Sequence, residues 1–266
     1  MQEQSVVSTD PDPGKSKTKC IFVCGKSVGL SKPTPLLLDG KELPWVATAS
    51  HLGHELHESG GMDHDASTKR AQFISKSTDI RETFNFASPV EILQAVKVFA
   101  GDMYGGNLWH LRGNQANQVF LSWNTCVKLA WNVPRNTHTY FVERILSCGI
   151  SHIRNDILSR YVTFLKSLRH SPSVEVSVVV NLVSRDIRTT TGSNLDLIKE
   201  LTGLDPWECT SREVKMVLAE TYKEMNNHDM WRIPYLGKLL ALRGELHSQL
   251  LDTNDVTNLI NSVCVN

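Results

Sequence analysis

The sequence predicts an α+β fold that is mostly α, with a short antiparallel β part near the start and a helical bundle behind it. Before residue 60, short stretches of β-branched and aromatic residues are separated by turn residues, which is typical of strands. From about Asp63 onward, apolar residues recur at helical spacing. Capping residues, glycines and prolines then divide this second part into separate helices.

The composition is that of an ordinary globular protein, and its charge is unevenly distributed. The 266 residues carry 28 Lys and Arg against 28 Asp and Glu. Between Gly105 and His170, however, eight Lys or Arg face only two acids, and the stretch from Glu175 to Asp255 is net acidic. A basic centre of this kind favours a polyanionic partner, and the alternative is a solvated helix face.

Cysteine spacing and hydropathy indicate an intracellular chain, nuclear or cytoplasmic, with no membrane partner. The six cysteines are scattered without a CxxC pair, which favours reduced thiols over a disulfide framework. The most apolar stretch, Val174–Val183, is interrupted by polar residues and is too short to cross a bilayer.

The first elements along the chain are extended. Residues 1–14 end in Asp-Pro-Asp-Pro-Gly and predict a disordered or extended lead. Lys19–Cys24 predicts a strand. Pro33–Gly40 predicts a strand running into an Asp-Gly turn, with Lys41–Ala47 as the return strand. Ala49–Leu56 predicts one further strand.

The helical part begins with an apolar stripe of Ala66, Phe73, Ile80 and Phe84, which predicts a helix from about Asp63 to Asn85. Ser88-Pro89-Val90-Glu91 is a capping box with proline at the first helical position, and we expect that helix to run to Gly105-Gly106. The next helix carries Val119, Trp123, Val127 and Ala130 on one face and ends before Pro134.

The remaining elements are also predicted as helices, including the valine-rich segment after Ser171-Pro172-Ser173, where propensity alone leaves a strand open. A loop is expected over Thr189–Ser193. The other predicted helices are His138–Leu146, Ser151–Arg169, Leu195–Thr202 (ended by Gly203), Glu213–Met225 and Leu236–Leu251.

Three stretches together carry a family resemblance. They are the Lys15–Gly25 strand with its Asp-Pro-Asp-Pro lead, the turn His51-Leu52-Gly53-His54, and the Trp123–Tyr140 segment, in which a Trp-Asn helix ends in Val-Pro-Arg-Asn-Thr-His. In order and spacing, residues from about Ser8 to Asn194 resemble the palm end and thumb of the reverse transcriptases of non-LTR (LINE-type) retrotransposons.

The resemblance implies four regions: a lead (1–14), a palm-end β cassette with a primer-grip-like turn (15–60), a thumb-like helical domain (61–170) and a helical C-terminal extension (171–266). The parent enzyme would be an RNA-directed DNA polymerase that uses Mg²⁺. No Tyr/Phe-x-Asp-Asp pair occurs in this sequence, and two-metal nucleotidyl transfer needs clustered carboxylates. We therefore expect a fragment without polymerase activity and without a cofactor of its own, whose missing partner is the N-terminal palm and fingers.

Candidate site residues follow from the same resemblance. Lys17, or Lys19 in its place, aligns with the lysine that would act as general acid to pyrophosphate, and the alternative is a lysine that protects a strand edge. His51, Leu52 and Gly53 would press against a primer terminus, with glycine allowing close approach, and the alternative is a structural hairpin turn.

Cations behind the turn are the remaining candidates for contact with an RNA–DNA or DNA duplex. Lys69, Arg70 and Lys76 lie on the first predicted helix among acids, so a solvated face is the alternative. Arg135 follows Pro134 and is the better phosphate contact, whereas Trp123 and Trp131 are expected to pack in the core.

Other chemistries receive little support. His51, His54 and His57 invite a zinc site, but on a single strand only His51 and His57 would share a face, and no metal is predicted. The alternative to the polymerase fragment is a non-enzymatic helical module that binds nucleic acid or a protein. An Asp-Asp palm encoded in frame upstream of Met1 would distinguish the first from the second.

Overall fold

The computed structural model describes residues 19–23, 34, 36–38, 40–51, 53–137, 142 and 146–219. The predicted fold class is confirmed, since helices dominate and the strands form two small antiparallel sheets. The chain divides into two compact units between Thr68 and Lys69. Within the described residues the four cysteines are free thiols.

In the first unit the Asp-Gly hairpin is present but short. Strand β1 (Leu37–Leu38) pairs antiparallel with β2 (Lys41–Glu42), and Gly40 takes a left-handed φ of 74° at the turn. The predicted return strand to Ala47 is wrong beyond Glu42. Pro44 lacks an N–H and so cannot extend the ladder of hydrogen bonds. The Pro44 carbonyl accepts the Cys20 N–H at 3.0 Å.

The strand predicted over Lys19–Cys24 is reduced to one parallel bridge between Cys20 and Trp45. The Val46 N–H donates to the Cys20 carbonyl at 2.9 Å, and the Phe22 and Trp45 rings meet edge to face with centroids 6.3 Å apart. Lys19 and Val23 are exposed on either side of this contact, and Cys24 lies outside the described residues. This segment is therefore held by one paired residue and not by a continuous ladder of hydrogen bonds.

The single strand predicted over Ala49–Leu56 is wrong, because the chain reverses inside it. Strand β3 (Thr48–His51) pairs antiparallel with β4 (His54–His57), with Gly53 at the turn. The reversal makes His51 and His54 direct cross-strand partners, so these two share a face and His57 lies on the other. The expectation that His51 and His57 share a face is therefore also wrong.

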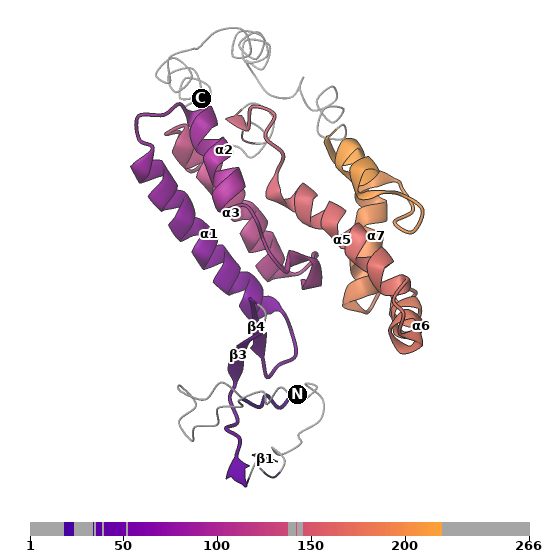
Figure 1. The fold of residues 1–266 in the computed structure, drawn as a ribbon. Coiled ribbons are helices and arrows are strands. Elements are labelled where there is room, and N and C mark those ends of the chain that lie inside the picture. Colours follow the sequence, from indigo (N-terminus) through magenta and orange to yellow (C-terminus); the bar gives the residue numbers. More distant parts are fainter. Residues whose placement is uncertain are drawn as a thin grey trace, which may run out of the picture. The chain divides into compact units, whose positions relative to one another are not determined.

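Helix α1 (Asp63–Thr83) starts at the predicted residue and crosses the boundary between the units. In the second unit Phe73 is buried, whereas Ile80 is half-buried and Phe84 is exposed, so the predicted apolar stripe covers only the first half of the helix. The Phe73 ring lies 6.5 Å from the ring of Trp123. This contact packs α1 against α3 (Asn114–Ala130), beside which it runs in Figure 1.

Helix α2 (Pro89–Phe99) has the predicted capping box, with Ser88 and Glu91 each bonding the other's backbone N–H. It ends at Phe99, well before the predicted Gly105, and Tyr104 is exposed beyond it. The N–H groups of Ala100 and Gly101 both bond to the Val96 carbonyl, and a Cβ at Gly101 would lie 2.6 Å from the Lys97 carbonyl oxygen. The glycine that permits this stop is thus Gly101.

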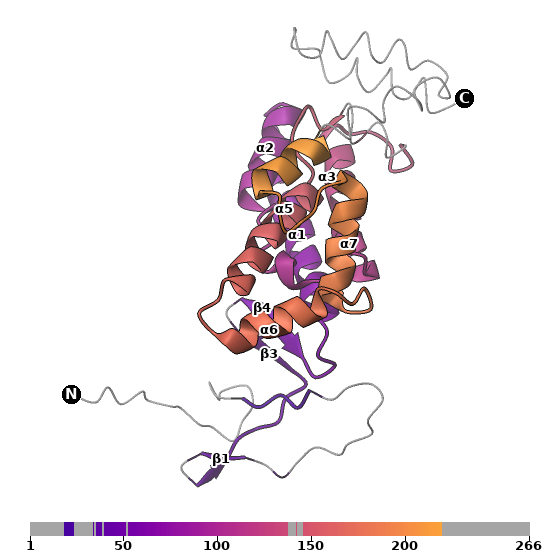
Figure 2. The ribbon, with the colours of Figure 1, turned by 90° about the vertical axis from the view of Figure 1, so that its right-hand side faces the viewer.

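The rest of the unit is helical, with the short 3-10 helix η1 (Gly106–Leu108), α5 (Ile153–Arg169), α6 (Val174–Val183) and α7 (Thr190–Thr202). Residues 211–219 are also helical. Figure 2 shows α6 crossing between the ends of α5 and α7. The core of this unit holds large, fully buried side chains, among them Leu93, Trp109, Trp123, Ile153, Ile157, Ile198 and Leu218.

Two predictions in this part have clear outcomes. The helix over Val174–Val183 is confirmed, with Ser173 accepting the Val176 N–H at 3.3 Å as its cap. The loop over Thr189–Ser193 is wrong, because Thr189 accepts the Gly192 N–H at 3.0 Å and starts α7 five residues before the predicted Leu195. A threonine cap followed by a glycine in the first turn resembles a loop in the sequence.

Longer stretches with predicted elements lie outside the described residues. They are the lead over residues 1–14, most of His138–Leu146, and the chain after Ala219, including Leu236–Leu251.

Candidate nucleic-acid interface

The predicted turn lies at the tip of the β3–β4 hairpin. His51 and Gly53 are exposed, and Gly53 has a φ of 79°, a left-handed conformation that residues with a Cβ adopt at a cost. Leu52 lies outside the described residues. A turn of this kind presents exposed backbone at its tip, which is the geometry that close backbone contact with a ligand requires.

A buried carboxylate ties this hairpin to the start of α1. The Glu55 N–H donates to Asp65 Oδ1 at 3.0 Å, and His54 Nδ1 lies 3.9 Å from Asp65 Oδ2. Asp65 is fully buried, and it lies in the first turn of α1, where the helix dipole favours a negative charge. The hairpin and the helix start therefore behave as one local structure within the first unit.

Of the two candidate lysines near the N-terminus, Lys19 is within the described residues. Lys17 lies outside the described residues. Lys19 is exposed directly before the Cys20 bridge. This position is compatible with both predicted roles of Lys19, a cation that faces a phosphate and a lysine that protects a strand edge.

The three cations predicted on α1 do not share one face. Lys69 and Lys76 are seven residues apart, close to two full helical turns, so they project in nearly the same direction. Arg70 is turned toward α3, where its Nε donates to Ser122 Oγ at 3.1 Å. Lys69 and Lys76 are therefore the pair that a polyanion would meet, and Arg70 is engaged in helix packing.

Arg135 is exposed just beyond the end of α3, as a phosphate contact would be. Its carbonyl accepts a hydrogen bond from Lys128 Nζ at 2.8 Å, which fixes the backbone there. Trp123 and Trp131 are buried, at 1% and 3% exposure, which confirms the prediction that they pack in the core. Trp131 also donates from Nε1 to the Leu146 carbonyl at 2.7 Å.

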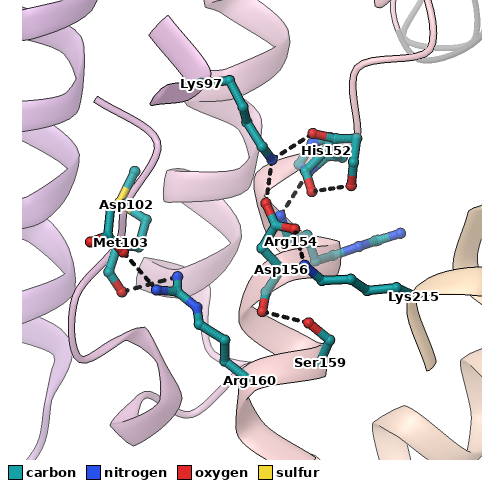
Figure 3. Close-up of polar contacts among 10 residues, drawn as sticks. Lys97, Asp102, Met103, His152, Arg154, Asp156, Ser159, Arg160 and Lys215 are labelled. Carbon is teal, nitrogen blue, oxygen red and sulfur yellow. Dashed lines mark hydrogen bonds and ion pairs between the residues drawn. The ribbon is translucent and has the colours of Figure 1, made fainter. Parts of the chain in front are cut away.

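A cationic cluster that the sequence did not single out lies where α2, α5 and residues 211–219 meet (Figure 3). The Asp156 carboxylate forms ion pairs with both Lys97 and Lys215. Lys97 also donates to the Ser151 carbonyl at 2.6 Å and lies 5.3 Å from the centre of the Trp123 ring. Burial lowers the pKa of Lys97, and the neighbouring Asp156 works against that shift.

His152 beside this cluster has a structural role. Its Nδ1 accepts the Arg154 N–H at 3.0 Å and so caps α5, and its ring lies against Phe120 and Trp123. Burial, with Arg154 and Lys97 nearby, lowers its pKa to about 3. The imidazole is therefore neutral at physiological pH and adds no positive charge to the cluster.

A small apolar pocket lies between α1 and α3. Its volume of about 30 Å³ leaves room for very few water molecules, far below what a small-molecule substrate needs. Cys126 lines it, and burial raises the pKa of this thiol to about 11, so it stays protonated at neutral pH. The pocket thus offers neither the room that a substrate needs nor a thiolate nucleophile.

Within the described ranges, no group of three or more His, Cys, Asp or Glu is placed to hold a metal ion. In the same part of the chain no helix combines the length and the apolar character that a bilayer crossing requires. A scan against models of protein families, a search of curated proteins and a search of solved structures each found no match.

Proposed function

We propose that this chain is part of the reverse transcriptase of a non-LTR retrotransposon and that it contacts the primer–template duplex. The observation that carries the proposal is the order of elements from residue 48 to residue 83. A tight hairpin turn at His51–Gly53 is followed at once by a long polar helix, which is the order that the resemblance implies for a primer grip and the thumb helix behind it.

Two physical features support duplex contact. Gly53 has no side chain to keep a sugar-phosphate backbone away from the exposed turn. On α1, Lys69 and Lys76 project in nearly the same direction, and cations so arranged release counterions when they neutralise phosphates. Neither feature selects a base, so the proposed contacts depend on the backbone and not on the sequence of the duplex.

The chemistry of the parent enzyme does not follow from these residues. Two Mg²⁺ ions would need clustered carboxylates, and the described residues offer no such ligand set. The role proposed for this chain is to hold and orient the duplex. We expect the purified chain to show no template-directed nucleotide incorporation, and incorporation would contradict that part of the proposal.

The direct test is binding of a fluorescent RNA–DNA hybrid, followed by anisotropy across a range of salt concentrations. Replacing both Lys69 and Lys76 with alanine should weaken binding and reduce the slope of log K against log salt by roughly 0.9 for each phosphate that is no longer neutralised. The matched control removes two cations elsewhere, the exposed Arg188 and Lys199, and should leave the slope unchanged. An equal weakening in both double variants, or no binding at low salt, would refute the proposal.

A further inference from the structure

Asp156 sits between two lysines that come from different elements. Lys97 reaches it from α2, and Lys215 Nζ, from the 211–219 helix, lies 3.2 Å from Asp156 Oδ1. Figure 3 shows the two ammonium groups on opposite sides of the carboxylate. One negative charge is therefore shared by two positive charges.

The next turn of α5 carries a further ion pair. Arg160 donates from Nη1 to Asp102 Oδ1 at 2.6 Å (Figure 3). Three cationic side chains, those of Lys97, Lys215 and Arg160, thus share two carboxylates, those of Asp156 and Asp102. His152 does not alter this sum, because it is neutral.

The cations of the cluster differ in their access to solvent. The Lys97 side chain is 20% exposed and is held by Asp156, by the Ser151 carbonyl and by the Trp123 ring. The side chains of Lys215 and Arg160 are 52% and 41% exposed, and each has one ion-pair partner. Lys97 is thus a fixed internal charge, whereas Lys215 and Arg160 can exchange a carboxylate for an incoming anion.

We propose that Arg160 and Lys215 form a second contact site for the sugar-phosphate backbone of duplex nucleic acid, with Asp156 as the internal anion that a phosphate displaces. This inference rests on the proposed function, because it takes the same class of ligand. Arginine can donate two parallel hydrogen bonds to a phosphate, and lysine adds a mobile point charge.

The internal carboxylate makes a distinctive prediction. Asp156→Asn removes a negative charge that repels phosphate and competes for Lys215, so affinity for the hybrid duplex should rise, by roughly fivefold at low salt. A purely structural role for Asp156 would give no gain, since removal of its ion pairs can only weaken the fold. Thermal unfolding of the same variant separates the two effects.

The complementary test removes the exposed cations. Arg160→Ala with Lys215→Ala should weaken hybrid binding and reduce the salt slope by roughly 1.8, the amount for two phosphates. The charge-preserving pair Arg160→Lys with Lys215→Arg should keep most of the slope, which excludes unfolding as the cause. The matched control is again Arg188→Ala with Lys199→Ala, which should bind like the wild type.

The outcomes separate this inference from the proposed function. If the Arg160 and Lys215 alanine pair binds like the wild type while the Lys69 and Lys76 pair binds more weakly, the second site is overturned and duplex binding through α1 stands. Unchanged or reduced affinity in Asp156→Asn would likewise overturn the inference. If the wild-type chain fails to bind the hybrid at low salt, both proposals fail together.

Discussion

Asn194 is the buried residue whose replacement tests the packing of α7 most directly. Its Oδ1 accepts the Leu111 N–H at 2.8 Å, and its Nδ2 donates to the Trp109 carbonyl at 2.8 Å. The side chain is fully buried, so it satisfies two backbone groups that solvent cannot reach. One amide thereby joins α7 to the chain segment between η1 and α3.

Asn194→Ala should therefore destabilise the second unit strongly. It leaves one buried N–H and one buried carbonyl without their partner, and each such group costs about 1–3 kcal/mol. We expect a loss of about 2–6 kcal/mol in the free energy of unfolding, a large part of the ~5–15 kcal/mol that a folded domain has. Urea unfolding followed by far-ultraviolet circular dichroism measures this loss.

Asn194→Asp adds a pH test at the same site. The new carboxylate can still accept from Leu111 but faces the Trp109 carbonyl, and burial raises its folded pKa above the unfolded value of about 3.9. A group with a raised folded pKa contributes stability below its unfolded pKa and loses it as pH rises. The deficit of this variant relative to the wild type should therefore grow from about pH 4 upward.

Asn181→Ala on α6 is the matched control. Asn181 is half-buried, and its Nδ2 donates to the Ser177 carbonyl one turn earlier, at 2.9 Å, where solvent can replace it. We expect this variant to change the free energy of unfolding by less than about 0.5 kcal/mol. Similar losses for Asn181→Ala and Asn194→Ala would refute the argument that burial of the Asn194 hydrogen bonds sets the cost.

Further predictions concern a cap, a glycine and a tryptophan. The folded pKa of His152 is about 3, below its ordinary value of 6.5. The stability that the neutral imidazole contributes is therefore present above pH 6.5 and is lost as pH falls toward 3. Unfolding measured at several pH values should show a smaller acid-induced loss of stability in His152→Gln than in the wild type. In an exposed helix, a Gly→Ala change stabilises the protein by about 1 kcal/mol. Gly192→Ala should instead destabilise this protein, since the new Cβ would lie 2.2 Å from the Asp186 carbonyl oxygen. A raised melting temperature would contradict this. Trp131→Phe should cost about 1–3 kcal/mol in urea unfolding, because it leaves the buried Leu146 carbonyl without its donor, and a neutral result would show that water replaces the indole.

Several features of the fold that depend on neighbouring residues were predictable from the sequence. The Ser88–Glu91 capping box, the start of α1 at Asp63 and the Asp39-Gly40 turn involve residues within a few positions of one another. Helix α6 was also predicted correctly, although its valines favour strands in isolation. A strand would need a partner ladder, and the segment between two helices offers none.

Other local features were not predictable, because periodicity and residue type do not distinguish their alternatives. The stop of α2 at Phe99 requires the close approach of Gly101 to the Lys97 carbonyl, which periodicity does not reveal. The same holds for the start of α7, whose cap at Thr189 was indistinguishable from loop residues. The strand predicted over Ala49–Leu56 ran through the turn that the sequence also indicated at His51–Gly53, and the reversal there decides which histidines share a face.

The candidate cations illustrate why charge along a sequence is a weak guide to a site. Arg70 lies between acids and lysines on a polar helix, yet it donates to Ser122, fifty-two positions away, and so serves packing. Lys97 and Lys215 lie outside the basic stretch from Gly105 to His170, yet they meet at Asp156, one of only two acids in that stretch. A carboxylate with few acidic neighbours is the position at which lysines from distant parts of the chain gain most from forming ion pairs. That electrostatic reason makes Asp156, and not the number of nearby arginines, the residue whose replacement best tests whether this surface receives phosphate.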